Sequence, residues 1–122
     1  MKKKILIIQG SNLKKIKIKT DTSFFLGLEA QRRGYQIYYY EPKDLSFVNG
    51  KVTALCSKVK FVDNPKQPVK VLNKTVLNLL QAKLILIRSE PPFNQQYINT
   101  TFILEHISKK VRIINHPKAL RE

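Results

Sequence analysis

Four consecutive apolar residues, at positions 84 to 87, form the most informative hydrophobic pattern in this chain. The run is too short for a helix, and charged residues on both sides and the prolines at 91 and 92 bound it. Such a run is typical of a strand buried on both faces, as in a parallel sheet covered by helices. We therefore expect 84–87 to be a central strand, and a similar apolar run predicts a first buried strand over 5–9.

The segment from Asp21 to Gly34 has the pattern of a helix with two defined ends. Asp21 is suited to cap the amino end, Phe24 and Leu28 are spaced for one apolar face, and Gly34 lies where a helix ends. Aromatic and β-branched residues then predict a second strand over 35–40. A strand, a helix and a strand in this order form a βαβ unit, which implies a parallel strand pair with a right-handed crossover.

An Asn49-Gly50 pair between two β-rich runs predicts a hairpin with a type I′ turn, and its second strand continues to Val62. Beyond it, four apolar residues are spaced for one helical face and predict a short helix within 69–81: Leu72, Val76, Leu79 and Leu80. Another helix is predicted from Asn94 to about Lys109, followed by a last strand over 111–114. The whole pattern is that of an α/β domain.

The strongly positive net charge suggests an anionic partner but does not show which kind. The chain has 122 residues, enough for one domain, and a net charge of +15. Nucleic-acid binding is one explanation, but the basic residues are mostly lysines spread along the chain, and arginines occur only at 32, 33, 88, 112 and 121. A solvated lysine-rich surface is the simpler explanation, and an anionic small substrate would also gain from this field. A small basic RNA-binding module remains the alternative of a different class.

Several common functional classes lack the residues that they need. One cysteine (Cys56) and two distant histidines cannot form a zinc site, and no phosphate-binding glycine motif is present. No acid or histidine neighbours Cys56 in the sequence, so we expect it to fill space in the core. A single cysteine fits a reducing cytoplasm. No apolar run is long enough to span a membrane or to serve as a signal peptide.

The turn after the predicted central strand is the best candidate site. It begins Arg88-Ser89-Glu90, and ligands of open α/β sheets bind just outside the carboxyl ends of such strands. Arg88 is the strongest candidate, as a partner for an anion. The helix start with Asp21 and Ser23 offers free backbone N–H groups that could hold a carboxylate, although both residues could equally serve only as caps. No self-contained set of catalytic residues is evident.

Five motifs, taken together, resemble the N-terminal region of the bacterial-type glutathione synthetases. They occur in the same order and at similar spacing over essentially the whole chain: Thr22-Ser23-Phe24, the stretch 28–35, the Asn49-Gly50 hairpin, Arg88-x-Glu90-Pro91-Pro92-Phe93, and Asn115-x-Pro117-x-x-Leu120-Arg121-Glu122. In that family this region is a Rossmann-like domain that precedes an ATP-grasp module. The resemblance thus implies that residues 1–122 are a single pre-ATP-grasp domain with a mainly parallel sheet flanked by helices, and that the C-terminal ATP-grasp domain is absent from the chain.

The family joins γ-glutamylcysteine to glycine, with ATP and Mg²⁺ bound by the ATP-grasp portion. The resemblance therefore implies a substrate-binding domain without catalytic, cofactor or metal residues of its own, inactive alone, within a cytoplasmic ligase that tends to form homo-oligomers. It implies that Arg88, Ser23 and Asp21 face γ-glutamylcysteine or glutathione, and that Glu90 orients Arg88 or the turn. Ser11-Asn12 and Thr20 depart from the family pattern along the same cleft wall. Another ATP-grasp peptide ligase with a different acyl substrate is the alternative within the class.

Overall fold

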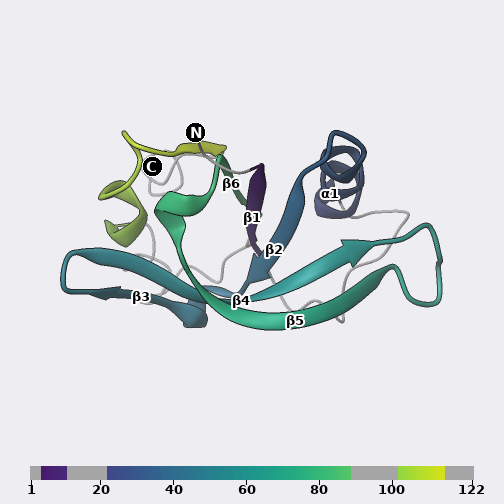
Figure 1. Ribbon diagram of the computed structural model, residues 1–122, viewed down its shortest axis with the longest axis horizontal. Helices are drawn as coiled ribbons and strands as arrows, with labels where there is room; N and C mark the ends of the chain where they lie inside the picture. The colour runs from purple at the N-terminus through teal and green to yellow at the C-terminus, as the bar shows by residue number, and fades with distance from the viewer. Residues whose placement is uncertain (1–3, 11–21, 89–101, 115–122) are drawn as a thin grey trace.

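The computed structural model describes residues 4–10, 22–88 and 102–114 of the chain, without the side chains of residues 22 and 23. The elements that lie wholly within these ranges are β1 (Ile5–Gln9), α1 (Thr22–Arg32), β2 (Gln36–Tyr40), η2 (Pro42–Asp44), β3 (Leu45–Val48), β4 (Lys51–Phe61), β5 (Val69–Asn78), η3 (Leu79–Gln81), β6 (Leu84–Ile87) and β7 (Arg112–Ile114), where η marks a short 3₁₀ helix. All seven strands belong to one curled sheet (Figure 1).

A parallel half of the sheet is built around β1. This strand pairs in parallel with β2 on one side and with β6 on the other, and β6 pairs in parallel with β7. All five residues of β1 and three of the four in β6 are buried. The predicted first strand, central strand and last strand are therefore confirmed, as is the parallel βαβ unit formed by β1, α1 and β2.

An antiparallel half is built around β4. Thr53 and Ala54 pair with β3 on one side and β5 on the other, while residues 57–59 pair with β2 on one side and β5 on the other. Strands β2 and β3 thus run one after the other along the same edge of β4, with η2 between them. In Figure 1, β4 and β5 form a long curved ribbon below the parallel strands.

The α/β class and the hairpin are confirmed, but the sheet is mixed. Three of the strand pairs among the described residues are parallel and three are antiparallel. The hairpin between β3 and β4 turns at Asn49 and Gly50, whose φ angles are 53° and 75°. Positive φ at both central residues is the signature of the predicted type I′ turn, and Asn and Gly tolerate it best.

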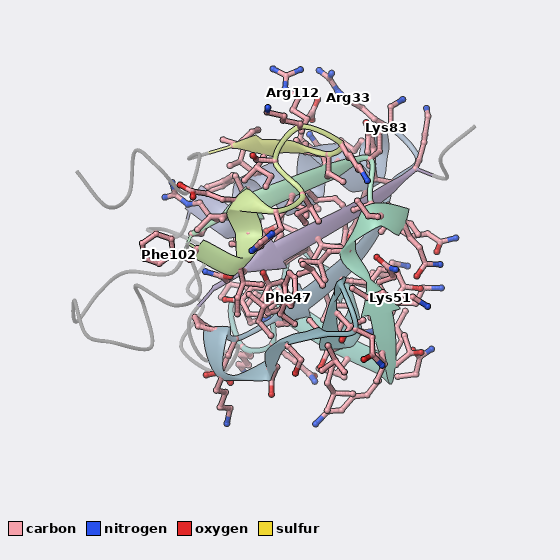
Figure 2. All side chains as sticks on the ribbon, turned by 90° about the vertical axis from the view of Figure 1, so that its left-hand side faces the viewer. Arg33, Phe47, Lys51, Lys83, Phe102 and Arg112 are labelled. Carbon is pink, nitrogen blue, oxygen red and sulfur yellow. The ribbon has the colours of Figure 1, made fainter. Side chains whose placement is uncertain are left out.

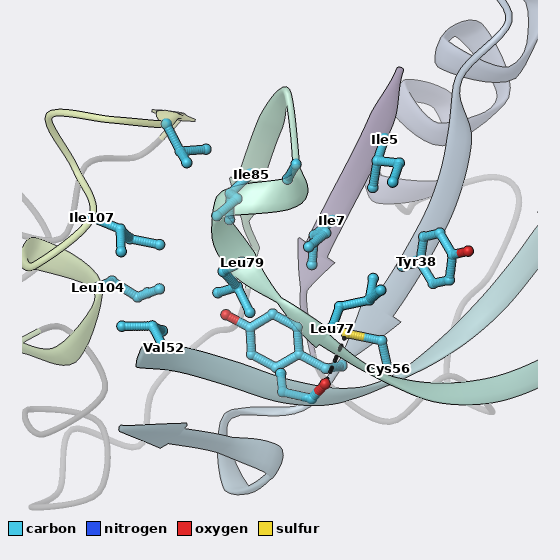
Figure 3. Close-up of a cluster of buried hydrophobic side chains, with 14 of the residues drawn as sticks. Ile5, Ile7, Tyr38, Val52, Cys56, Leu77, Leu79, Ile85, Leu104 and Ile107 are labelled. Atoms are coloured by element: carbon cyan, nitrogen blue, oxygen red, sulfur yellow. Dashed lines mark hydrogen bonds between the residues drawn. The ribbon is translucent and has the colours of Figure 1, made fainter. Parts of the chain in front are cut away.

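The sheet separates two hydrophobic clusters. Figure 3 shows part of the first cluster, in which Ile5, Ile7 and Ile85 of the parallel half pack with Leu104 and Ile107. The second lies on the other face, where Phe24 of α1 packs on Leu6, Ile8 and other residues of the sheet. Tyr38 and Tyr40 belong to the first cluster and Tyr39 to the second, so the alternation expected for the second strand is confirmed.

The short helix predicted within 69–81 is wrong for most of its length. Residues 69–78 form β5, and only η3 at Leu79–Gln81 is helical. Leu72 and Val76, expected on a buried helical face, are 54% and 64% exposed. Within β5 the buried residue is Leu77. The prediction from apolar spacing was wrong because most of β5 is exposed. A strand shows alternating apolar and polar residues only when one of its faces is buried.

The predicted helix over 94–109 ends earlier than expected within the described residues. Residues 102–105 are α-helical, and residues 106–110 form turns with successive bonds between positions three apart, such as that from the Ser108 N–H to the Glu105 carbonyl. These turns place Leu104, Ile107 and Val111 in the first cluster. Phe93, Asn94 and the rest of that predicted start lie outside the described residues.

Candidate functional site

The carboxyl ends of three parallel strands meet at one edge of the sheet. Gln9, the last residue of β1, pairs with Tyr40 at the end of β2 and with Ile87 at the end of β6. Residues that follow these strands must therefore lie together, at the edge where open α/β sheets bind ligands. Gly10 and Arg88 are the described residues that follow β1 and β6 directly.

Arg88 is held at this edge by its own backbone. Its N–H donates to the Gln9 carbonyl at 2.7 Å, which continues the β6–β1 pairing by one residue. The residue is half-buried, whereas Arg32, Arg33 and Arg112 are exposed. Figure 2 shows Arg33 and Arg112 projecting with Lys83 from one end of the molecule, and these three residues precede or begin β2, β7 and β6. Of the described arginines, Arg88 alone lies at the carboxyl edge.

Gly10 lies against β2 so closely that a side chain would not fit. Its N–H donates to the Tyr40 carbonyl at 3.1 Å, and a Cβ at this position would collide with the hydroxyl and ring of Tyr39. The glycine is required because the Tyr39 side chain fills the space that a side chain at this position would occupy.

A buried hydrogen bond between Gln9 and Tyr40 connects the ends of β1 and β2 at this edge. Gln9 is 1% exposed and its Oε1 accepts a hydrogen bond from the Tyr40 hydroxyl at 2.7 Å. Burial, and secondarily the nearby Cys56, raise the pKa of Tyr40 well above its ordinary value, so the phenol stays protonated and donates. Sequence reasoning treated Gln9 only as the end of a strand. The signal was a polar residue closing an apolar run.

The other three predicted binding residues are not placed beside Arg88 by the structure. Asp21 and Glu90 lie outside the described residues, and Ser23 lies in the first turn of α1 with its side chain undescribed. The helix does begin at Thr22, directly after the expected cap position. Their roles stay predictions. What the structure brings together is Arg88, Gly10 and the Gln9–Tyr40 pair.

Cys56 and His106 do not contribute to this edge. Cys56 is fully buried in the first cluster, as expected, and burial together with Asp44 raises the pKa of its thiol to about 12. It is therefore a neutral thiol at physiological pH rather than a nucleophile. His106 lies against the Phe47 ring, with centroids 4.5 Å apart. Within the described ranges no three residues of the kinds that ligate metals cluster together.

The arrangement favours binding an anion, because it places one half-buried guanidinium at the carboxyl edge of a parallel sheet. Glu41, which directly follows β2, is an acid at the same edge. In the same part, none of the helices has the length and apolar character needed to cross a membrane.

Comparison with known proteins identifies a family over nearly the whole chain. Residues 4–121 match the family model described as "Prokaryotic glutathione synthetase, N-terminal domain". The chain is 39% identical over 121 residues to glutathione synthetase of Mesorhizobium japonicum, covering 99% of this chain and 38% of the relative. It is 43% identical to that of Wigglesworthia glossinidia brevipalpis and 38% identical to that of Escherichia coli K12, each over 108 residues, which are 88% of this chain and 34% of the relative. The chain therefore spans little more than a third of these relatives.

Proposed function

The chain belongs to the N-terminal domain family of prokaryotic glutathione synthetases, and on that premise we propose that it is the substrate-binding domain of such an enzyme. In this proposal the complete protein joins γ-glutamylcysteine to glycine and hydrolyses ATP to ADP and phosphate. The observation that supports it is the position of Arg88, which is half-buried at the carboxyl edge of the sheet, next to the end of β1.

Arg88 would bind a carboxylate of γ-glutamylcysteine or of glutathione. A guanidinium can form two parallel hydrogen bonds with a carboxylate, and partial burial strengthens that pair because less water competes for it. Asp21 and Ser23, at or before the start of α1, and Glu90, two residues after Arg88, are proposed to complete the same wall of the cleft. The Gln9–Tyr40 pair fixes the end of β1 from which Arg88 is positioned.

ATP and Mg²⁺ are assigned to an ATP-grasp domain, the proposed partner of this domain. Mg²⁺ prefers carboxylate oxygens, and the described residues bring no cluster of acidic side chains together. The described residues therefore do not form a site that fits Mg²⁺. We propose that this domain alone is inactive. The complete enzyme is proposed to be cytoplasmic, consistent with the free, buried thiol of Cys56 in this chain, and to form homo-oligomers.

A chimera tests the proposal directly. The chain replaces the matching third of the Escherichia coli relative, and ligation of γ-glutamylcysteine to glycine is measured together with ADP release. We expect ligation by the chimera and none by the chain alone. A folded chimera that binds ATP but prefers a different acyl substrate would instead identify another peptide ligase, and one that ligates nothing would contradict the proposal.

Variants of the chimera test the role of Arg88. Loss of a hydrogen-bonded charge costs about 1.5–3 kcal/mol, so Arg88→Ala is expected to raise the KM for γ-glutamylcysteine by about tenfold or more while the KM for ATP stays unchanged. Arg112→Ala removes an exposed arginine elsewhere in the sheet and is the matched control. An equal rise of both KM values in Arg88→Ala would mean that the residue is structural.

A further inference from the structure

A shallow pocket lies away from the proposed substrate site. It is formed where the end of α1, the start of β2 and the facing parts of β4 and β5 meet (Figure 1). Its volume is about 250 Å³, and eight residues line it: Gln31, Tyr35, Gln36, Ile37, Lys58, Val59, Lys60 and Leu72. Strand β2 leads away from this pocket toward the carboxyl edge, and the four steps from Gln36 to Tyr40, at about 3.3 Å each, span about 13 Å.

Positive charge gathers at the pocket without a matching acid. Lys58 is half-buried and Lys60 is exposed, and none of the eight lining residues is acidic. Within the described part of the chain neither lysine forms an ion pair, and the ion pairs found there join Glu29 to Arg32 and Arg33. The Lys4 ammonium lies 5.9 Å from the centre of the Tyr35 ring and adds a further cation. An anion in the pocket would relieve this repulsion.

The pocket also has an apolar edge. Leu72 is 54% exposed, whereas Val59 and Ile37 are 3% and 1% exposed and their side chains belong to the second cluster. Leu72 is the extra residue of a β-bulge, because Lys58 pairs with Asn73 and Val59 pairs with Val71. Bulges redirect side chains and are over-represented next to binding sites. Here the bulged residue adds a large exposed apolar side chain to the pocket lining.

One wall of the pocket is fixed before any ligand binds. The Gln31 side chain donates to the Phe61 carbonyl at 2.9 Å and accepts from the Phe61 N–H at 2.6 Å. These two bonds connect α1 to the end of β4, so the helix side of the pocket is held in place. A wall that is already ordered lowers the entropy that a ligand must lose on binding.

We propose that this pocket binds a small organic anion, in which a phosphate or carboxylate is attached to an apolar group. Lys58 and Lys60 contact the charged group, and Leu72 contacts the apolar group. The pocket is a second binding site, separate from the proposed substrate cleft, and it does not depend on the identity of the substrate bound there.

The probe that tests this site is phenyl phosphate, with inorganic phosphate and benzoate as the two partial probes. Titration of the ¹⁵N-labelled chain, followed by NMR, should give saturable shifts at residues 35–37, 58–60 and 72. Phenyl phosphate is expected to bind more tightly than inorganic phosphate, because only phenyl phosphate gains from an apolar contact with Leu72. A comparison of the dissociation constants of benzoate and phenyl phosphate then shows whether the site prefers a carboxylate or a phosphate.

Two double variants with the same change in net charge separate the pocket from the general basic field. Lys58→Gln with Lys60→Gln is expected to weaken phenyl phosphate binding by about tenfold or more. Lys51→Gln with Lys109→Gln, at exposed positions that neither line the pocket nor pair with its residues, should change it by less than about twofold. Leu72→Ser should weaken phenyl phosphate binding and leave inorganic phosphate binding unchanged.

Three results would overturn the proposal. The first is the absence of saturable shifts around residues 35–37 with any of the three probes. The second is equal weakening in the two double variants, which would assign binding to the overall positive field. The third is a single-stranded oligonucleotide that binds more tightly than phenyl phosphate and loses affinity equally in both double variants, which would indicate a polyanion surface instead.

Discussion

The parallel half of the sheet and the β4–β5 ribbon differ in how much of each strand is removed from water. Every residue of β1 is buried, whereas nine of the ten residues of β5 are exposed or half-buried. The parallel strands are covered on both faces, by α1 on one side and by residues 104–111 on the other. The candidate sites follow this division: Arg88 lies at the end of the buried strands, and the anion pocket lies where the ribbon meets them.

The largest expected difference between the two regions is in side-chain truncation. Ile7 on β1 is 0% exposed and Val76 on β5 is 64% exposed. Ile7→Ala should lower the free energy of unfolding by about 2–5 kcal/mol, because it removes buried apolar contacts and leaves a cavity. Val76→Ala should change it by no more than about 0.5 kcal/mol. Urea unfolding of both variants measures the contrast, and similar losses would mean that the ribbon's outer face is covered in solution.

The next largest effect concerns the polar pair inside the parallel half. Tyr40→Phe removes the donor to buried Gln9 and should cost about 1–3 kcal/mol of unfolding free energy. Tyr38→Phe is the matched control, since Tyr38 lies on the same strand and face and no hydrogen bond of its hydroxyl is found within the described residues. The same loss in both variants would show that the cost comes from the hydroxyl's packing rather than from the bond to Gln9.

A pH effect of about 1.4 kcal/mol is expected from Cys56, which lies where the two regions meet. Its thiol has a pKa of about 12 in the fold against an ordinary value of 9.0. A raised pKa means that the folded state favours the neutral thiol, so this stability is complete below pH 9 and is lost as pH rises toward 12. At pH 10 the loss should be about 1.4 kcal/mol.

Thermal unfolding between pH 8 and pH 10 checks this effect, and Cys56→Ala should flatten that part of the profile. The range ends at pH 10 because the phenols of the unfolded chain begin to titrate there. An unchanged slope in Cys56→Ala would assign the pH dependence to other groups.

The smallest effect is a gain of stability on the ribbon. Lys60 and Lys70 lie directly opposite each other on β4 and β5, and like charges in that position repel. Lys70→Glu should therefore raise the free energy of unfolding by about 0.2–1 kcal/mol in dilute buffer. The gain should disappear in about 1 M salt, where the screening length is about 3 Å. Destabilisation by Lys70→Glu would mean that Lys70 makes a favourable contact in solution.

The sequence predicted the buried half better than the ribbon, for a physical reason. In 5–9 and 84–87 burial on both faces demands unbroken apolar runs, and Asn49-Gly50 fits a turn that few other pairs tolerate. Strand β5 has little buried surface, so chance spacing of Leu72 and Val76 imitated a helix. The hydrophobic pattern also did not predict the mixed sheet, because the direction of a strand relative to its neighbours depends on contacts between residues that are distant in sequence.

The candidate site was predicted only in part. Arg88 was found because it directly follows a strand whose limits the apolar run defines. The Gln9–Tyr40 bond was missed because it depends on the register between β1 and β2, which one strand alone does not reveal. The anion pocket was missed because its lining comes from α1, β2, β4 and β5, and a bulge adds Leu72 to it. Roles for Asp21, Ser23 and Glu90 remain predictions.

The placement of β2 and β3 along one edge of β4 has a consequence for how the chain folds. The hairpins β3–β4 and β4–β5 each pair strands that are close in sequence. The pairing of β1 with β6 instead joins residues far apart in the chain, such as Leu6 and Leu84. Because closing a long loop is slow, the hairpins should form first and shorten the search that brings β6 to β1. The half of the sheet with the least buried surface would then act early, as the template on which the buried half assembles.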